Sequence, residues 1–196
     1  MARIIAITGG IGCGKSVVSN VLRTRGWNVI DSDSHARQIM DGSPEIKRRL
    51  CDEIHPCAVN PEGEIDRKLI AGIVFADRVM LERLNSIVHA AVLESLLDIA
   101  HNAPQKVVFV ETAILYQSGL DRIVDEEWRV ECPLELRISR VMRRNSLTRS
   151  QVVDRINSQK AESPLHTHLP LTIIQNDSVI PVLPQLDDAL AASGVN

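Results

Sequence analysis

The residues from Gly9 to Ser16 have the types and the spacing of a loop that binds nucleotide phosphates. Gly9 is followed by four residues and then by Gly14-Lys15-Ser16. Glycines in such a loop let backbone N–H groups turn inward around an anion, and the positive end of the next helix adds to the attraction. The lysine reaches the β- and γ-phosphates, and the serine hydroxyl ligates Mg²⁺. The alternative is a glycine turn that only caps a helix. The candidate nucleotide-binding residues here are Gly10, Ile11, Gly12, Cys13, Gly14, Lys15, Ser16 and Val17.

Three carboxylates follow apolar runs that read as buried strands. Glu111 ends "KVVFVE", where an acid can hold Mg²⁺ directly or through water, although an ordinary acid at a strand end is the alternative. Asp31 ends "WNVID" and Asp33 follows it, which places both at the carboxyl edge of a parallel sheet, where α/β proteins bind ligands. A carboxylate at that edge can take the proton of an attacking hydroxyl, whereas Asp33 can equally cap a helix.

Arginines crowd a short stretch late in the chain. Arg137, Arg140 and Arg144 are spaced three and four apart, so they share one face of a helix. Guanidinium groups suit phosphate oxygens and the charge of a transferring phosphoryl group. A solvated helix face is the usual meaning of such a run, and only the phosphate loop favours the first interpretation.

The chain alternates between strands and helices, which predicts an α/β fold with a parallel sheet. A long, mostly helical region occupies residues 43–102, broken by a loop at 55–66 and ending in one long helix within 77–102. An insertion of this size is a natural place for a second substrate. The predicted strands are 3–8, 27–31, 106–111, 127–132 and 171–176, and the other predicted helices are 15–25, 32–40, 134–160 with a break at 146–148, and 182–192.

Composition excludes several classes of protein. The 196 residues fit one domain, and the net charge of −3 argues against a nucleic-acid-coating protein. No 18-residue apolar run and no secretory signal are visible, so we expect no membrane partner and a cytoplasmic location. The four cysteines form no CxxC pair, which is typical of a reducing compartment, and the spacing of Cys51, His55 and Cys57 argues against a zinc site.

Taken together, these motifs resemble the dephospho-coenzyme A kinase family over the whole chain. "GGIGCGKS" is similar to the family's "GGIGSGKS", with Cys13 in place of serine, and "VIDSDSHAR" resembles "viDADxxAR". "GEIDRKLIAGIVF" is similar to "GxLDRxxLxxxVF", and "IVHAAV" to "IxHPxI" with Ala90 in place of proline. Other small-molecule kinases share the loop but not this series of motifs.

The resemblance implies a P-loop NTPase fold: a single kinase domain over 1–196, with a five-stranded parallel sheet flanked by helices, a helical acceptor-binding region at about 41–102 and a helical lid at about 137–166. It implies transfer of the γ-phosphate of ATP to the ribose 3′-hydroxyl of dephospho-CoA, with Mg²⁺, as the last step of coenzyme A biosynthesis. From the net charge and the low aromatic content we expect no nucleic-acid partner, and we expect a monomer or a weak homo-oligomer. The implied catalytic residues are Asp33 as base, Lys15, and Arg140 of the lid. Arg144 and Asn176 join the loop in binding ATP, and Ser16 and Glu111 hold Mg²⁺. The implied acceptor-binding residues are Asp31, Arg37, Arg67 and His89, although His89 has the alternative of a buried, hydrogen-bonded helix histidine.

The chain departs from the family pattern in its second half. "ETAILYQSGL" corresponds to "DxPLLFESGL", so Glu111 replaces aspartate and Gln117 replaces glutamate. "LPLTIIQNDS" replaces "ADxVIxNxG", so Pro170 and Leu171 stand for Ala-Asp. Adenine-side packing is therefore expected to differ. The alternatives are another P-loop kinase with a nucleotide or metabolite acceptor, and a nucleotide switch, which the absence of an Asn-Lys-x-Asp motif weakens.

Overall fold

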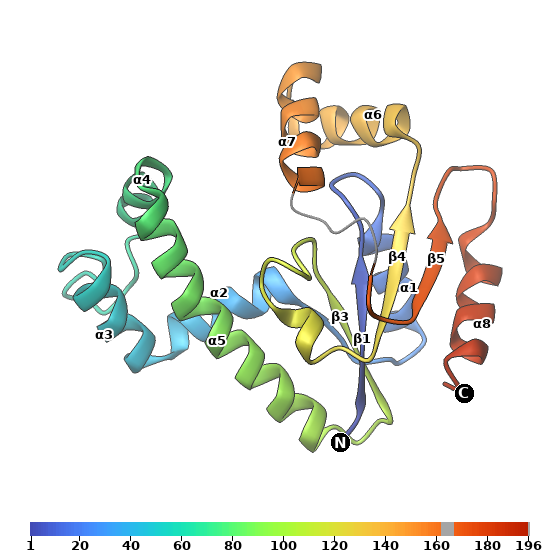
Figure 1. Cartoon of the computed structure of the whole chain (residues 1–196), viewed down its shortest axis with the longest axis horizontal. Helices are drawn as coiled ribbons and strands as arrows, with labels where there is room; N and C mark the ends of the chain where they lie inside the picture. The colour runs from blue at the N-terminus through green and yellow to red at the C-terminus, as the bar shows by residue number, and fades with distance from the viewer. Residues whose placement is uncertain (162–166, 196) are drawn as a thin grey trace. The chain divides into compact units, whose positions relative to one another are not determined.

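The computed structural model describes residues 1–161 and 167–195, and its strands form one parallel sheet (Figure 1). The strand order is β2-β3-β1-β4-β5, so all five carboxyl ends meet at one edge. Each strand lies within three residues of its predicted bounds. The strands are β1 (Arg3–Thr8), β2 (Val29–Asp31), β3 (Val107–Glu111), β4 (Glu126–Glu131) and β5 (Leu171–Gln175).

The chain divides into two compact units. The first comprises Met1–Asp31 and Asp98–Asn196, and the second is Ser32–Leu97. The expected acceptor-binding region, about 41–102, falls mostly within the second unit. Its role as an acceptor site stays a prediction.

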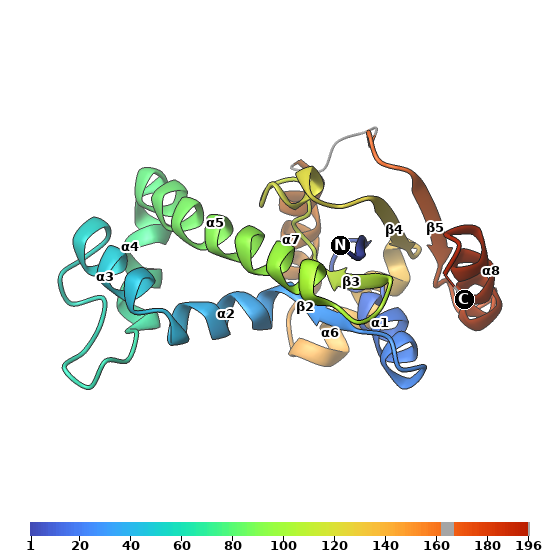
Figure 2. The same ribbon diagram turned by 90° about the horizontal axis from the view of Figure 1, so that it is seen from below.

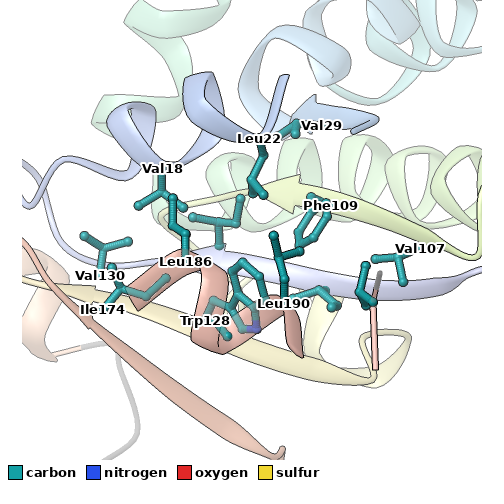
Figure 3. Close-up of a cluster of buried hydrophobic side chains, with 14 of the residues drawn as sticks. Val18, Leu22, Val29, Val107, Phe109, Trp128, Val130, Ile174, Leu186 and Leu190 are labelled. Atoms are coloured by element: carbon teal, nitrogen blue, oxygen red, sulfur yellow. The ribbon is translucent and has the colours of Figure 1, made fainter. Parts of the chain in front are cut away.

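The first unit buries its core between the sheet and two helices. Val18 and Leu22 of α1 (Lys15–Thr24) belong to one apolar cluster with Leu186 and Leu190 of α8 (Val182–Ala192) and with the strand residue Trp128 (Figure 3). Burying each such side chain contributes about 1.5–3 kcal/mol. Because α1 is fixed to the sheet in this way, the loop between β1 and α1 has two rigid ends.

One expectation about α1 is wrong. The spacing places Val17 with Val18, Val21 and Leu22 on the apolar side of the helix, but the Val17 residue is 46% exposed. Val18, the next residue of α1, is 0% exposed, so Val17 is exposed because it lies about 100° around the helix from Val18 and faces away from the core. Its exposure leaves it available to a bound nucleotide.

Two further helices of the first unit pack on each other. The break predicted at 146–148 is present between α6 (Leu134–Asn145) and α7 (Arg149–Ala161), where Ser146 ends α6 in the left-handed region at φ 52°. These helices bury Ile138 and Val141 of α6 against Val152 and Ile156 of α7. The remaining short helix, η1 (Leu120–Arg122), precedes β4.

The second unit is built from helices with their own apolar cluster. It contains α2 (Ser32–Gly42), α3 (Pro44–Glu53), α4 (Arg67–Ala76) and α5 (Arg78–Asn102), of which only residues 98–102 belong to the first unit. Met40, Leu50, Val74 and Ile87 are among its buried residues. Helices α2 and α5 contact each other, since His35 Nε2 lies 3.0 Å from Ser95 Oγ, and Figure 2 shows the two helices next to each other.

Helix starts in the second unit have clear causes. Ser43 Oγ accepts a hydrogen bond from Ile46 N at 3.2 Å, and Asp66 accepts one from Leu69 N at 2.9 Å, which are standard N-caps.

Among the residues that the structure describes, no helix combines the length and apolarity needed to cross a membrane.

Candidate active site

The loop after β1 has the backbone of a phosphate-binding loop. Gly12 and Gly14 have φ of 80° and 94°, a region that side-chain-bearing residues rarely adopt. Space is also restricted: a Cβ on Gly12 would lie 2.8 Å from the Arg137 carbonyl oxygen, and one on Gly14 would overlap the amide of Asn176. Arg137 and Asn176 therefore pack directly against the loop, and glycine is required at the positions where the loop turns.

Lys15 lies along this loop. Its Nζ donates to the Gly9 carbonyl oxygen at 2.8 Å, which holds the ammonium group across the loop rather than in solvent. Lys15 is also the first residue of α1, so its backbone lies at the positive end of the helix. This geometry places two sources of positive potential where phosphates are expected.

Asn176 contacts the loop from the neighbouring strand end. It follows β5, its backbone N–H donates to Glu131 O at 2.8 Å, and its Nδ2 donates to Cys13 O at 2.8 Å. Cys13 itself is 3% exposed and belongs to the main core cluster, so it packs as a small apolar residue. Cys13 and Asn176, both expected to bind ATP, are thus in direct contact.

Arg140 and Arg144 lie differently. Arg140 Nη1 donates to the Asn176 carbonyl oxygen at 3.1 Å and to Cys132 Sγ at 3.2 Å, and its Nη2 donates to Ser178 Oγ at 3.1 Å. Arg140 is therefore held at the carboxyl edge of the sheet, beside β4 and β5. Arg144 is exposed, and its Nε donates to Asn145 Oδ1 at 3.0 Å. Its contact with ATP stays a prediction.

Carboxylates from two neighbouring strands also meet at this edge. Asp31 of β2 is the register partner of Glu111 of β3, and Glu111 is in turn the partner of Ile7 in β1. In the described part of the chain, neither the Glu111 carboxylate nor the Ser16 hydroxyl has a hydrogen-bond partner. One hydroxyl and one carboxylate fit Mg²⁺, which takes few protein oxygens and completes its shell with water and substrate phosphates.

The remaining predicted residues belong to the second unit. Asp33 and Arg37 are exposed on α2. The Asp33 carboxylate accepts no hydrogen bond from the described residues, so the structure does not support a helix-capping role for it. Arg67 Nη2 donates to both carboxylate oxygens of Asp41, at 2.8 and 2.9 Å. His89 is half-buried in α5, and this burial lowers the pKa of its imidazole.

Sequence reasoning missed a buried carboxylate next to the loop. Glu127 in β4 is 1% exposed and accepts hydrogen bonds from Thr8 Oγ1 at 2.7 Å, Tyr116 Oη at 2.5 Å and Arg129 Nε at 2.8 Å. Burial alone would raise the pKa of Glu127, but the hydrogen bonds from Arg129, Tyr116 and Thr8 outweigh it and lower the pKa. Thr8 directly precedes Gly9, so this carboxylate anchors the start of the phosphate loop. Acidic residues inside an apolar strand were the only available signal.

A family model described as dephospho-CoA kinase matches residues 3–181. The chain belongs to the dephospho-CoA kinase family. A dephospho-CoA kinase of Bacteroides fragilis is 35% identical over 192 residues, covering 97% of this chain and 93% of its own length. One of Moorella thermoacetica is 32% identical over 164 residues, covering 82% and 77% respectively.

Solved structures agree on the fold. A crystal structure of a Thermus thermophilus protein has a TM-score of 0.75 and 31% identity, covering 98% of this chain and 96% of that one. A dephospho-CoA kinase from Campylobacter jejuni has a TM-score of 0.64 at 21% identity, covering 99% and 96%. The expected P-loop fold with a five-stranded parallel sheet is confirmed.

Proposed function

We propose that the chain transfers the γ-phosphoryl group of ATP to the ribose 3′-hydroxyl of dephospho-CoA, giving CoA and ADP. The family match over residues 3–181 carries this conclusion. The reaction is the final step of coenzyme A biosynthesis, and the chain is an ATP-dependent kinase. The residue roles that follow are our assignment.

The ATP side of the reaction belongs to the first unit. The N–H groups of the loop and the start of α1 bind the phosphates, and Lys15 neutralises charge on the β- and γ-phosphates. Ser16 and Glu111 would hold Mg²⁺, which would offset the negative charge of the phosphates. Arg140 supports the transferring phosphate, and Arg144 and Asn176 complete the ATP site.

The acceptor side requires a group that receives the proton of the 3′-hydroxyl. Asp33 is our assignment for that base, because a carboxylate beside the reacting hydroxyl orients it and accepts its proton. Its exposure and lack of hydrogen-bond partners among the described residues leave its oxygens available. We assign acceptor binding to Asp31, Arg37, Arg67 and His89, with Arg67 exchanging its contact with Asp41 for the substrate.

We further propose that the protein works in the cytoplasm as a monomer or weak homo-oligomer, without nucleic-acid or membrane partners. The four cysteines are free thiols, which suits a reducing compartment.

The decisive experiment supplies purified protein with ATP, Mg²⁺ and a panel of acceptors: dephospho-CoA, adenylate and a sugar acid. We expect phosphorylation of dephospho-CoA alone, detected as CoA and ADP in equal amounts. Activity on adenylate without activity on dephospho-CoA would replace the proposal with another P-loop kinase. ATP binding without consumption in the presence of every acceptor would indicate a nucleotide switch.

A further inference from the structure

Ile11, in the middle of the phosphate loop, is held by both α6 and α7. Its carbonyl oxygen accepts a hydrogen bond from Arg137 Nε of α6 at 3.0 Å, and its N–H donates to Gln159 Oε1 of α7 at 2.7 Å. Its side chain packs on the apolar cluster between the same two helices, against residues that include Ile138 and Val152. The loop is therefore fixed at its middle as well as at its ends.

Arg137 also determines which residue can occupy position 10. A Cβ on Gly10 would overlap the Arg137 guanidinium, mainly its Nη2 and Cζ atoms. Gly10 is not among the glycines with positive φ, so its backbone conformation is open to alanine. The guanidinium, and not the backbone, is what requires glycine at this position.

Arg137 forms no ion pair with a carboxylate among the described residues. Glu135, two residues earlier, pairs with Arg149 at 2.7 Å, and no described acid pairs with Arg137. A half-buried guanidinium that contacts Gly10 and Ile11 therefore adds positive potential beside the loop. The same side chain supplies both a fixed hydrogen bond and a charge.

We propose that Arg137 is a positioning residue for ATP. It holds the loop through the Ile11 carbonyl and lies over Gly10, so that the loop is already shaped for the phosphates before ATP arrives. This inference rests on the proposed function, because it assumes that ATP binds the loop. Preorganisation of this kind lowers the cost of binding and is expressed mainly in the affinity for ATP.

The first test is kinetic. Arg137→Ala should raise KM for ATP about tenfold, the cost of one hydrogen bond from a charged donor, with a smaller change in kcat and none in KM for dephospho-CoA. Arg137→Lys should recover part of the loss. The matched control is Arg143→Ala, which removes an exposed arginine from the same helix. An unchanged KM in Arg137→Ala, or an equal rise in Arg143→Ala, would overturn the inference.

The second test uses equilibrium binding of ATP without acceptor. Gly10→Ala should weaken binding in the otherwise unchanged protein, because its Cβ meets the guanidinium, and should cost several-fold less in the Arg137→Ala background. Equal costs in both backgrounds would show that Arg137 does not shape the loop. This readout needs no turnover, so it separates failure of the inference from failure of the proposed kinase activity. If Arg137→Ala does not fold by thermal unfolding, Arg137→Gln carries the same comparison.

Discussion

Lys15 belongs to the phosphate loop and contacts its first residue, Gly9. Its hydrogen bond to Gly9 O spans the loop, so the ammonium group is held close to the site expected for the β- and γ-phosphates. Charge that is fixed before the reaction stabilises developing charge without the cost of reorganising solvent. Lys15 is therefore the residue whose removal should affect chemistry most directly.

We predict that Lys15→Ala lowers kcat for CoA formation by on the order of 10²–10³, because a fixed charge on the phosphates is lost. The melting temperature should stay within a few degrees, since Lys15 is not part of the core. Steady-state kinetics and thermal unfolding check the two halves. Full activity would remove the loop from the mechanism.

Asp33 tests the acceptor side separately. We expect Asp33→Asn to lower kcat by on the order of 10² while the equilibrium affinity for ATP is retained, because the amide keeps the shape but cannot accept the proton. Asp52→Asn is a matched control, since Asp52 is an acid of the same unit that pairs with Arg48. An unchanged rate in Asp33→Asn would exclude Asp33 as the base.

At the scale of elements, β4 combines structural and functional constraints. Its Glu127 joins Thr8 at the end of β1, Tyr116 from the segment after β3, and Arg129 two residues along β4. A buried carboxylate is tolerated only when its oxygens are satisfied in this way.

We predict that Glu127→Gln lowers the free energy of unfolding at pH 7 by about 2 kcal/mol, the scale of hydrogen bonds to a charged group. The pKa of Glu127 is lowered in the folded state, so its contribution is present above the pKa of the unfolded chain, about 4.3, and is lost as pH falls through the folded value. The difference between the two proteins should therefore shrink below about pH 4.

Urea unfolding at a series of pH values measures this difference. Tyr116→Phe is the control, since it removes one neutral donor and should cost about 1 kcal/mol at pH 7. A constant difference between wild type and Glu127→Gln at every pH would contradict the role of the ionised carboxylate.

The strands and the loop could be predicted from the sequence, whereas the contacts between them could not. Every strand except β4 (EEWRVE) is a short, mostly apolar run, and the loop is a pattern contained within eight residues, so local sequence patterns were enough to predict them. The bonds from Thr8 to Glu127 and from Arg137 to Ile11 join residues 119 and 126 positions apart. No periodicity encodes such pairs, and for that reason Arg137 could be read only as one arginine in a run. Val17 was misplaced because the spacing of apolar residues does not show how wide the buried face of α1 is: Val18 is buried, whereas its neighbour Val17 is exposed.

At the scale of the whole molecule, the two units divide the proposed labour. The first contains the phosphate loop, and the second contains Asp33, Arg37, Arg67 and His89. A division of this kind predicts that each substrate stabilises mainly its own unit.

Hydrogen exchange can test that division. We expect ATP with Mg²⁺ to slow exchange chiefly in residues 9–17, and dephospho-CoA to slow it chiefly within Ser32–Leu97, because binding stabilises the backbone that it contacts. The exposed helix α8 surface serves as an internal reference. Protection by dephospho-CoA confined to the first unit would contradict the acceptor assignment.

The strand order also has a consequence for how the chain folds as it is made. β1 pairs only with β3 and β4, whose residues begin about 100 positions later, and the whole second unit is synthesised in between. The second unit has an apolar cluster of its own, so it can fold on the ribosome before β3 and β4, the partners of β1, have been synthesised. Sheet assembly is then the late and slow event, since pairing over such separations pays a large loop-closure entropy. The phosphate loop, suspended from β1, takes its final shape only at that point.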